Sequence, residues 1–119
     1  MNELVYLAGP YSYNPQAAFE KHLFYTAKLM KAGFQVFSPI AHNHQLATDY
    51  DFPTDHKFWQ AHNEIVLLKC DEVFVMTEPG WQNSKGVQFE INLALDSLIP
   101  VRYLKVTNDM ISIKHTPSE

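Results

Sequence analysis

The chain has 119 residues, a length that suits one domain with a single hydrophobic core. Hydrophobic residues make up 46% of it and charged residues 18%, a balance that excludes an intrinsically disordered chain. The formal net charge is -4 and there is no basic run. This excludes a nucleic-acid polymer as partner, because contacts to a phosphate backbone need clustered positive charge.

Cysteine content and hydropathy bear on the cellular compartment. Cys70 is the only cysteine, so no intrachain disulfide forms, as is typical of a reducing compartment. The N-terminus lacks the positively charged segment of a signal peptide, and no stretch approaches the roughly 18 apolar residues that a membrane span requires. We therefore expect a cytoplasmic, soluble protein with no membrane partner.

The chain begins with the pattern of a strand followed by a helix. Residues 4–8 are a short apolar run that ends at Gly9-Pro10, which predicts a buried strand and then a turn. Residues 15–32 predict a helix, with Gly33 as its C-terminal stop. This helix is expected to bury one apolar stripe, formed by Phe19, Leu23, Ala27 and Met30.

The middle of the chain predicts two strands, a loop and a helix. Residues 35–38 predict a second strand, and residues 40–54, which show no convincing period, predict a loop. Residues 72–76 are β-branched and aromatic, which is typical of a central parallel strand. Between them, residues 55–69 predict a second helix on the apolar residues Phe58, Ile65 and Leu68.

The last third of the chain repeats the alternation. Ser84 is a good N-cap for a helix that is expected to reach about residue 98. Residues 100–104 predict a fourth strand, and residues 110–113 predict an additional edge strand. The helix is expected to present one apolar face, formed by Val87, Ile91, Ala94, Leu95 and Leu98.

Strands that alternate with helices predict an α/β fold: one domain over residues 1–119, with a parallel sheet of four to five strands flanked by helices. In open sheets of this kind, ligands bind outside the carboxyl ends of the strands. Three predicted loops meet there, at residues 9–15, 39–53 and 77–84. We therefore expect the functional site at this edge of the sheet.

Ser84, Gly86 and Glu90 form the most informative constellation at that edge. The free N–H groups in the first turn of the helix carry partial positive charge and, with the Ser84 hydroxyl, suit one phosphate. Gly86 lies four residues before Glu90, on the same helix face, and leaves room for a ring-shaped ligand at the carboxylate. The spacing alone favours a simpler reading, a serine that only caps a helix and a solvated glutamate, because serine-capped helices that contain a glutamate are common.

Five segments together resemble a known family. They are Tyr6-Leu7-Ala8-Gly9-Pro10-Tyr11-Ser12, Phe37-Ser38-Pro39-Ile40-Ala41-His42, Phe58-Trp59, Cys70-Asp71, and Gly80-Trp81 with Ser84-x-Gly86-x-x-x-Glu90. Over about residues 4–104 the chain resembles the nucleoside 2-deoxyribosyltransferase superfamily. More narrowly, it resembles a small branch found in bacteria and phages that is similar to 2′-deoxynucleoside 5′-monophosphate N-glycosidases.

This resemblance implies a doubly wound, flavodoxin-like or Rossmann-like parallel sheet, in agreement with the strand–helix alternation. Members of the superfamily cleave the bond between deoxyribose and a base. Their nucleophile falls on Glu90, and the tyrosine that orients it falls on Tyr6. Ser84 matches the position that binds a 5′-phosphate in members acting on nucleotides, where a hydroxyl, unlike an acid, does not repel the phosphate.

Further residues are expected to line the pocket. The resemblance places Gly9, Pro10 and Tyr11 in the loop beside the sugar and base. Trp81 and Tyr11 are suited to stack on a flat base. His42 follows a predicted strand end and is expected to border the pocket, although a hydrogen bond that fixes its loop explains it equally well.

No metal and no cofactor are expected. His42 and His44 form a His-x-His pair, but no third ligand stands at a fixed spacing, and the resemblance implies no metal. The glycine-rich motifs of triphosphate and dinucleotide sites are absent from the sequence. Trp59, within a predicted helix, is better explained by a core or subunit-interface role than by base stacking.

One position departs from the family. The superfamily usually places an aspartate on the second helix, four residues after a tryptophan and near the leaving base. Counted from Trp59, that position is Asn63. An amide does not deliver a proton as a carboxylic acid does. Three explanations of Asn63 stay open. The asparagine is natural, and the base is held by hydrogen bonds and protonated by water or His62; or the chain is a variant from which the acid was removed; or the protein binds its ligand without efficient turnover.

The expected function is hydrolysis of the N-glycosidic bond of a 2′-deoxynucleoside 5′-monophosphate through a glycosyl ester on Glu90. One alternative is a transferase that passes the sugar to a second base. Another is a non-catalytic nucleotide-binding module, favoured by Asn63. The partner is thus a small-molecule deoxynucleotide or deoxynucleoside, and the resemblance further implies a homodimer or a larger homo-oligomer.

Overall fold

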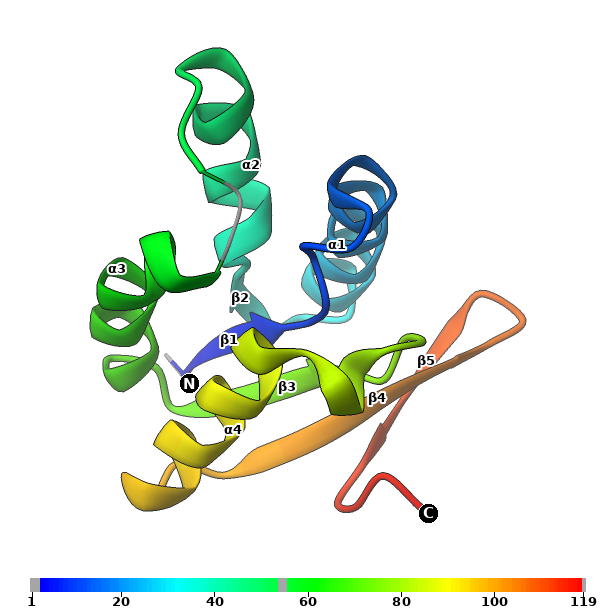
Figure 1. The fold of residues 1–119 in the computed structure, drawn as a ribbon. Helices are drawn as coiled ribbons and strands as arrows, with labels where there is room; N and C mark the ends of the chain where they lie inside the picture. Colours follow the sequence, from blue (N-terminus) through cyan, green and yellow to red (C-terminus); the bar gives the residue numbers. More distant parts are fainter. Residues whose placement is uncertain (1–2, 54–55, 119) are drawn as a thin grey trace.

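Five strands form a single sheet in the computed structural model, which describes residues 3–53 and 56–118. The order β2-β1-β3-β4-β5 is flavodoxin-like; β1 to β4 are parallel, and β5 is antiparallel to β4 (Figure 1). The strands are β1 Leu4–Ala8, β2 Gln35–Phe37, β3 Glu72–Met76, β4 Val101–Thr107 and β5 Met110–Lys114. The predicted α/β fold and its edge strand are confirmed.

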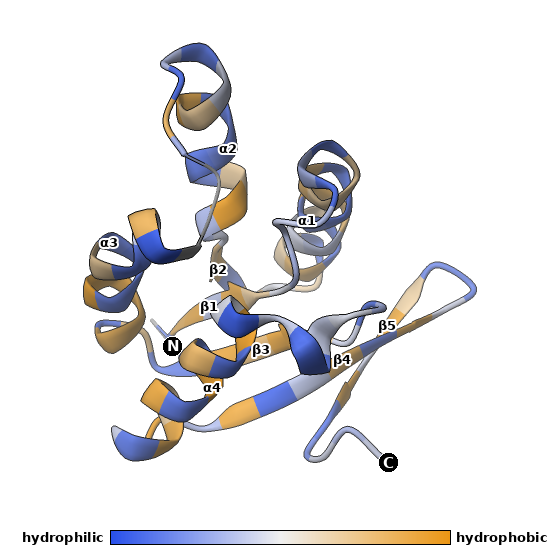
Figure 2. Cartoon of the chain, viewed as in Figure 1, coloured by the Kyte–Doolittle hydropathy of each residue, from blue (hydrophilic) through white to orange (hydrophobic). Residues whose placement is uncertain are grey.

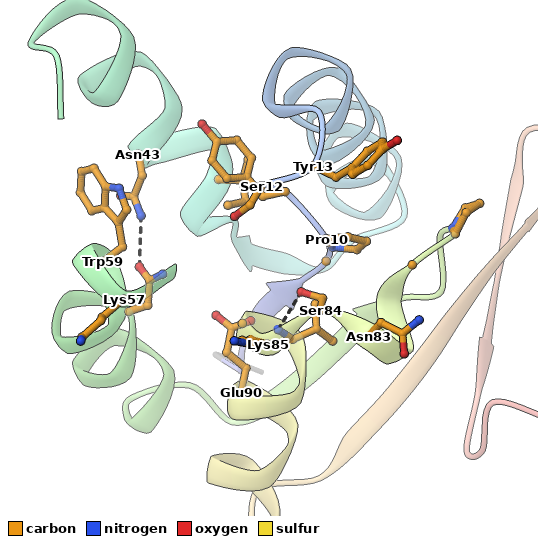
Figure 3. Close-up of a pocket in the computed structure, with 18 residues that line it drawn as sticks. Pro10, Ser12, Tyr13, Asn43, Lys57, Trp59, Asn83, Ser84, Lys85 and Glu90 are labelled. Atoms are coloured by element: carbon orange, nitrogen blue, oxygen red, sulfur yellow. Dashed lines mark hydrogen bonds between the residues drawn. The ribbon is translucent and has the colours of Figure 1, made fainter. Parts of the chain in front are cut away.

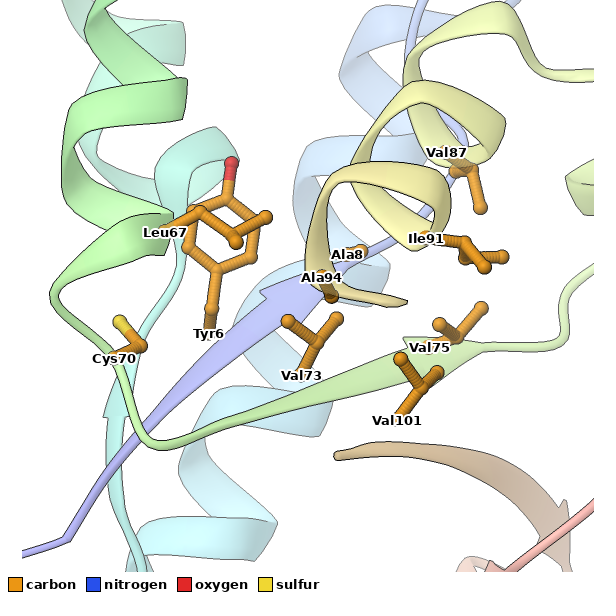
Figure 4. Close-up of a cluster of buried hydrophobic side chains, with 10 residues drawn as sticks. All are labelled: Tyr6, Ala8, Leu67, Cys70, Val73, Val75, Val87, Ile91, Ala94 and Val101. Carbon is orange, nitrogen blue, oxygen red and sulfur yellow. The ribbon is translucent and has the colours of Figure 1, made fainter. Parts of the chain in front are cut away.

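Helices cover both faces of this sheet. They are α1 Pro15–Lys31, α2 Pro39–Asp49, α3 His56–Leu68 and α4 Lys85–Asp96, with a short 3-10 turn at Trp81–Asn83. Hydrophobic residues predominate in β1 and β3, which lie between the helices (Figure 2). Alternate residues of β1 face opposite layers: Val5 and Leu7 pack with α1. Tyr6 and Ala8 pack with α3 and α4 (Figure 4). No helix in the described part of the chain is long and apolar enough to cross a bilayer.

The predicted loop over residues 40–54 is wrong for most of its length, because α2 occupies Pro39–Asp49. Ser38 caps this helix, since its Oγ accepts a hydrogen bond of 3.1 Å from the backbone N–H of Ala41, and Pro39 fits the first turn. The inward face includes the polar residues Asn43 and His44, so no apolar period marks the helix. Residues 54 and 55 lie outside the described residues.

The predicted core stripe of α1 is also wrong. Leu23, Ala27 and Met30 are exposed, and Phe19 is half-buried against the ring of His44. The face that meets the sheet instead carries two polar rings and one leucine, namely His22, Tyr25 and Leu29. The Tyr25 hydroxyl donates to Glu78, and Nε2 of His22 lies 3.4 Å from the Pro10 carbonyl, whereas the buried Nδ1 of His22 has no partner within the described residues. The face of α1 that meets the sheet is therefore not the one that the apolar spacing predicts.

The ends and faces of the other helices agree in part with the prediction. Gly33 ends α1 with a φ of 104°, as expected of a residue in the left-handed region. In α4 the residues Val87, Ile91 and Ala94 are buried, but Leu95 and Leu98 are exposed. In α3 the predicted apolar residues Phe58, Ile65 and Leu68 are exposed. A single chain leaves this α3 face open.

Candidate active site

A pocket of about 860 Å³ opens at the carboxyl ends of β1 and β3, where the predicted loops were expected to meet. It is lined by residues 9–13 after β1, by Pro79 and Gly80 after β3, and by residues 83–87 at the start of α4 together with Glu90. Figure 3 shows α2 and α3 completing the opposite wall with Asn43, Lys57 and Trp59.

Glu90 is the buried carboxylate of this pocket. Its side chain is 7% exposed, and the hydroxyl of Tyr6 on β1 donates a hydrogen bond to its Oε2. Burial raises the pKa of Glu90 to about 7, and the Tyr6 hydrogen bond opposes that rise. Burial, followed by the charge of Glu90, raises the pKa of Tyr6 well above its ordinary value, so Tyr6 stays a donor. The carboxylate is thus held in one orientation and titrates near neutral pH.

The start of α4 lies beside Glu90. Ser84 caps the helix, because its Oγ accepts a hydrogen bond of 3.2 Å from the N–H of Val87. Ser84 and Gly86 both line the pocket, in agreement with the sequence-based expectation. Lys85 also lines it and is exposed, so a cationic side chain stands next to the helix N-terminus. This end of the pocket suits an anionic group.

Asn63 also lines the pocket, opposite α4. It is 7% exposed, and its Oδ1 accepts a hydrogen bond of 3.1 Å from Nδ2 of Asn43 on α2. The buried Oδ1 of Asn43 has no partner within the described residues. Glu90 is the one carboxyl group among the described lining residues. The wall facing Glu90 therefore presents amides, not a second carboxylic acid.

The structure does not bring two of the predicted residues to the pocket. His42 is exposed and stacks on His62 with ring centroids 5.6 Å apart, because α2 turns its side chain away. Trp81 packs against Tyr103 of β4 and the core beneath α4, so base stacking by Trp81 is not supported. Trp59 instead lines the pocket, and its indole N–H donates to the Pro53 carbonyl at 2.8 Å.

The loop after β1 enters the pocket as expected. Gly9, Pro10 and Tyr11 all line it. A Cβ on Gly9 would come within 2.8 Å of the Met76 sulfur and 3.0 Å of the His22 ring, so only glycine fits here without a shift of those side chains. The absence of a side chain at Gly9 therefore lets the loop pass close to Met76 at the end of β3.

Several lining residues were not anticipated. Asn43 was missed because its helix was read as a loop, and Lys57 and Lys85 were missed because a lone exposed lysine carries no motif. The signal for Asn43 was Ser38-Pro39, a capping serine followed by a proline at the first helical position. Within residues 3–53 and 56–118, no three His, Cys, Asp or Glu side chains gather to hold a metal.

The fold and pocket define an open α/β domain with a buried carboxylate at the ends of its parallel strands. Residues 3–105 match a protein family described as a domain of unknown function (DUF1937), and the chain belongs to that family. A search of curated proteins found no match.

Proposed function

We propose that this protein is a 2′-deoxynucleoside 5′-monophosphate N-glycosidase with Glu90 as nucleophile. The observation that carries the proposal is the pairing of Glu90 with Tyr6 at a pocket whose adjacent end is a serine-capped helix N-terminus. A carboxylate held by a donor suits attack on the anomeric carbon of a sugar. The helix N-terminus, with Lys85, suits the 5′-phosphate.

The reaction would proceed in two displacements. The Glu90 carboxylate oxygen attacks C1′, the C1′–N bond breaks, and its electron pair leaves with the base, which takes a proton from water. Water then attacks C1′ of the glycosyl ester and gives its proton to the hydroxide that the first displacement left, which releases deoxyribose 5-phosphate and restores the Glu90 carboxylate. Tyr6 keeps the attacking carboxylate in place throughout. Asn63 would hold the base through amide hydrogen bonds.

The protonation state of Glu90 bears directly on this chemistry. The nucleophile must be ionised, and the pKa of Glu90 is raised to about 7. The rate of base release should therefore rise as the pH increases through about 7 in the free enzyme. A rate that falls over this range would instead identify Glu90 as a general acid and remove the nucleophile from the proposal.

The proposal is tested with a panel of deoxynucleotides and deoxynucleosides, incubated with and without a free acceptor base. Chromatography should detect released base without acceptor, more from nucleotides than from nucleosides, and none with Glu90→Ala. Exchange that requires the acceptor would establish the transferase instead. Intact-mass measurement during turnover should show one deoxyribose phosphate attached to the protein. Absence of product with every substrate would overturn both enzymatic proposals.

The second candidate is a nucleotide-binding module without turnover. The amide pair of Asn43 and Asn63 favours it, because no carboxylic acid among the described lining residues faces Glu90 to protonate a leaving base. Asn63→Asp separates the two candidates. It should increase base release about tenfold or more if the residue lies at the leaving base. Tight nucleotide binding without product in either protein would establish the binding module.

We further propose a cytoplasmic homodimer or larger homo-oligomer. On α3, Phe58, Ile65 and Leu68 are 48%, 61% and 46% exposed, a cluster of large apolar side chains that a second copy would cover. Ile65→Asp should dissociate the assembly in sedimentation equilibrium, whereas Met110→Asp on β5, at a position 71% exposed, serves as the control. A wild-type monomer throughout the micromolar range would contradict this assembly.

A further inference from the structure

A hydrogen-bond network connects the pocket with the surface of α1. The hydroxyl of Tyr11, a pocket residue, lies 2.8 Å from Nδ1 of His44 on α2. The other ring nitrogen of His44, Nε2, lies 3.3 Å from Oε1 of Gln16 on α1. Nε2 of Gln16 in turn lies 3.1 Å from the carboxylate of Glu20. None of these contacts belongs to the nucleophile or to the helix N-terminus described above.

Glu20, at the outer end of this network, determines which atom donates and which accepts in each of its hydrogen bonds. An ionised carboxylate only accepts hydrogen bonds, so the amide nitrogen of Gln16 must face Glu20, which leaves Oε1 facing His44. Because Oε1 only accepts, Nε2 of His44 carries the proton. In the neutral imidazole Nδ1 is then an acceptor, and the Tyr11 hydroxyl must donate to it.

Burial surrounds the inner part of this hydrogen-bond network, whereas Gln16 and Glu20 at its outer end are exposed. His44 is 8% exposed and stacks on Phe19, with ring centroids 4.2 Å apart and planes 19° apart. Burial raises the pKa of Tyr11, so its hydroxyl stays neutral. The hydroxyl proton is directed at His44, and only the oxygen lone pairs remain for a ligand.

We propose that Tyr11 is a specificity residue whose hydroxyl oxygen accepts a hydrogen bond from a neutral donor of the ligand, a hydroxyl or an amino group, and that His44, Gln16 and Glu20 are positioning residues that impose this polarity. The inference rests on the proposed function for the identity of the ligand as a deoxynucleotide. In that ligand the donors are the sugar 3′-hydroxyl and the exocyclic amino group of the base. A phosphate or carbonyl oxygen would meet the lone pairs of Tyr11 and be disfavoured there.

The donor and acceptor roles in this hydrogen-bond network are tested without any ligand. Long-range ¹H–¹⁵N correlation spectra at pH 8 should show His44 with a protonated Nε2 and an unprotonated Nδ1. Tyr11→Phe should shift the Nδ1 resonance while the tautomer persists, and Tyr13→Phe, at a fully exposed tyrosine, should leave it unchanged. A proton on Nδ1 of His44 would overturn the inference, because Tyr11 would then have its own proton free for the ligand.

The ligand contact is tested by calorimetry in a Glu90→Gln background, which prevents turnover. The probes are dAMP and dCMP, their deaminated counterparts dIMP and dUMP, and the 2′,3′-dideoxy forms of dAMP and dCMP. Binding of a probe that lacks the recognised donor should be about tenfold weaker, and Tyr11→Phe should abolish that difference. If Tyr11→Phe removes only the discrimination against the dideoxy probes, the donor that Tyr11 recognises is the 3′-hydroxyl. If it removes only the discrimination against the deaminated probes, that donor is the amino group of the base.

Nucleotide binding and the specificity role of Tyr11 are contradicted by different results. If none of the nucleotides binds, the proposed function is overturned. If nucleotides bind and Tyr11→Phe changes the affinity of every probe equally, or of none, the function survives and the specificity role of Tyr11 is overturned. His44→Phe, which keeps the stacking on Phe19, should reduce discrimination because the Tyr11 hydroxyl is then free to rotate.

Discussion

The two walls of the pocket are built by different means. On the α4 wall, Ser84 and Glu90 are placed by a capped helix whose apolar face, Val87 and Ile91, packs on the sheet. On the α2 wall the helix turns polar residues inward, and Asn43 finds its partner, Asn63, on another helix. The α4 wall is thus positioned by burial of apolar area, and the α2 wall by hydrogen bonds.

This difference has consequences for stability and for function. Apolar burial tolerates exchange of one side chain for another of similar volume, whereas a buried hydrogen-bonded pair leaves an unsatisfied group when one partner is removed. The walls also differ in charge, since the α4 wall carries Glu90 and Lys85, whereas the facing wall carries Lys57 and the neutral amides of Asn43 and Asn63. The following predictions use substitutions that separate these contributions.

The largest effect is expected from the nucleophile of the α4 wall. Glu90→Gln keeps the volume and the ability to accept from Tyr6, but it removes the nucleophilic charge. Base release should fall by about a thousandfold or more. Initial rates measured by chromatography, with circular dichroism to verify folding, provide the check. A reduction of less than tenfold in a folded variant would exclude Glu90 as the nucleophile.

The same carboxyl group should make stability depend on pH. Its folded-state pKa of about 7 exceeds the ordinary 4.5, so its contribution is fully present below about pH 4.5 and is lost as the pH rises through about 7. The loss is on the order of 3 kcal/mol. Glu90→Gln should therefore become progressively more stable than the wild type between pH 5 and 8 in urea titrations. An unchanged difference across this range would contradict the raised pKa.

His22 is a second buried titratable group, so the pH dependence of wild-type stability alone does not isolate the contribution of Glu90. Burial lowers the pKa of His22 to about 4, so its contribution to stability is present above the unfolded value of 6.5 and is lost as the pH falls through about 4. The slopes from His22 and Glu90 oppose each other and overlap in the wild type. The difference between wild type and Glu90→Gln isolates the carboxyl group, since His22 is common to both.

The two helix caps provide a matched pair. Ser84 caps α4 and Ser38 caps α2, with hydrogen bonds of 3.2 and 3.1 Å to the third helical N–H. Each Ser→Ala change should cost about 1 kcal/mol of unfolding free energy. Only Ser84→Ala should also raise KM for nucleotides, because Ser38 does not line the pocket. Equal KM values in the two variants would remove the phosphate role of Ser84.

The smallest effect is expected outside both walls. Leu98 follows α4 at a φ of 59°, a left-handed conformation that is unfavourable for a branched side chain, and it is 91% exposed. Leu98→Gly should stabilise the protein by about 1 kcal/mol or less, because it relieves this conformation with little loss of packing. Thermal unfolding should show a small increase in Tm, with kcat and KM unchanged. A decrease in Tm would indicate that Leu98 is covered in an assembly.

Wherever apolar spacing coincided with burial, the sequence alone was sufficient. The strands of the parallel sheet, the start of α4 at Ser84 and the proximity of Glu90 to Gly86 were all predicted, because each depends on local pattern or on the common edge of parallel strands. Gly33 was predicted as a helix stop for a similarly local reason, its freedom to adopt positive φ.

The partners of buried polar groups were decided by the tertiary structure alone. Asn43 is buried although asparagine is usually exposed, and His22 is buried too, whereas Leu23 and Met30 are exposed although their spacing is that of a core face. Hydrogen bonds between elements distant in sequence, such as that from Asn43 to Asn63, accompany the polar side chains that α2 turns inward. Periodicity records the hydropathy of single residues and not the position of their partners, so the α2 wall of the pocket could be seen only in the folded chain.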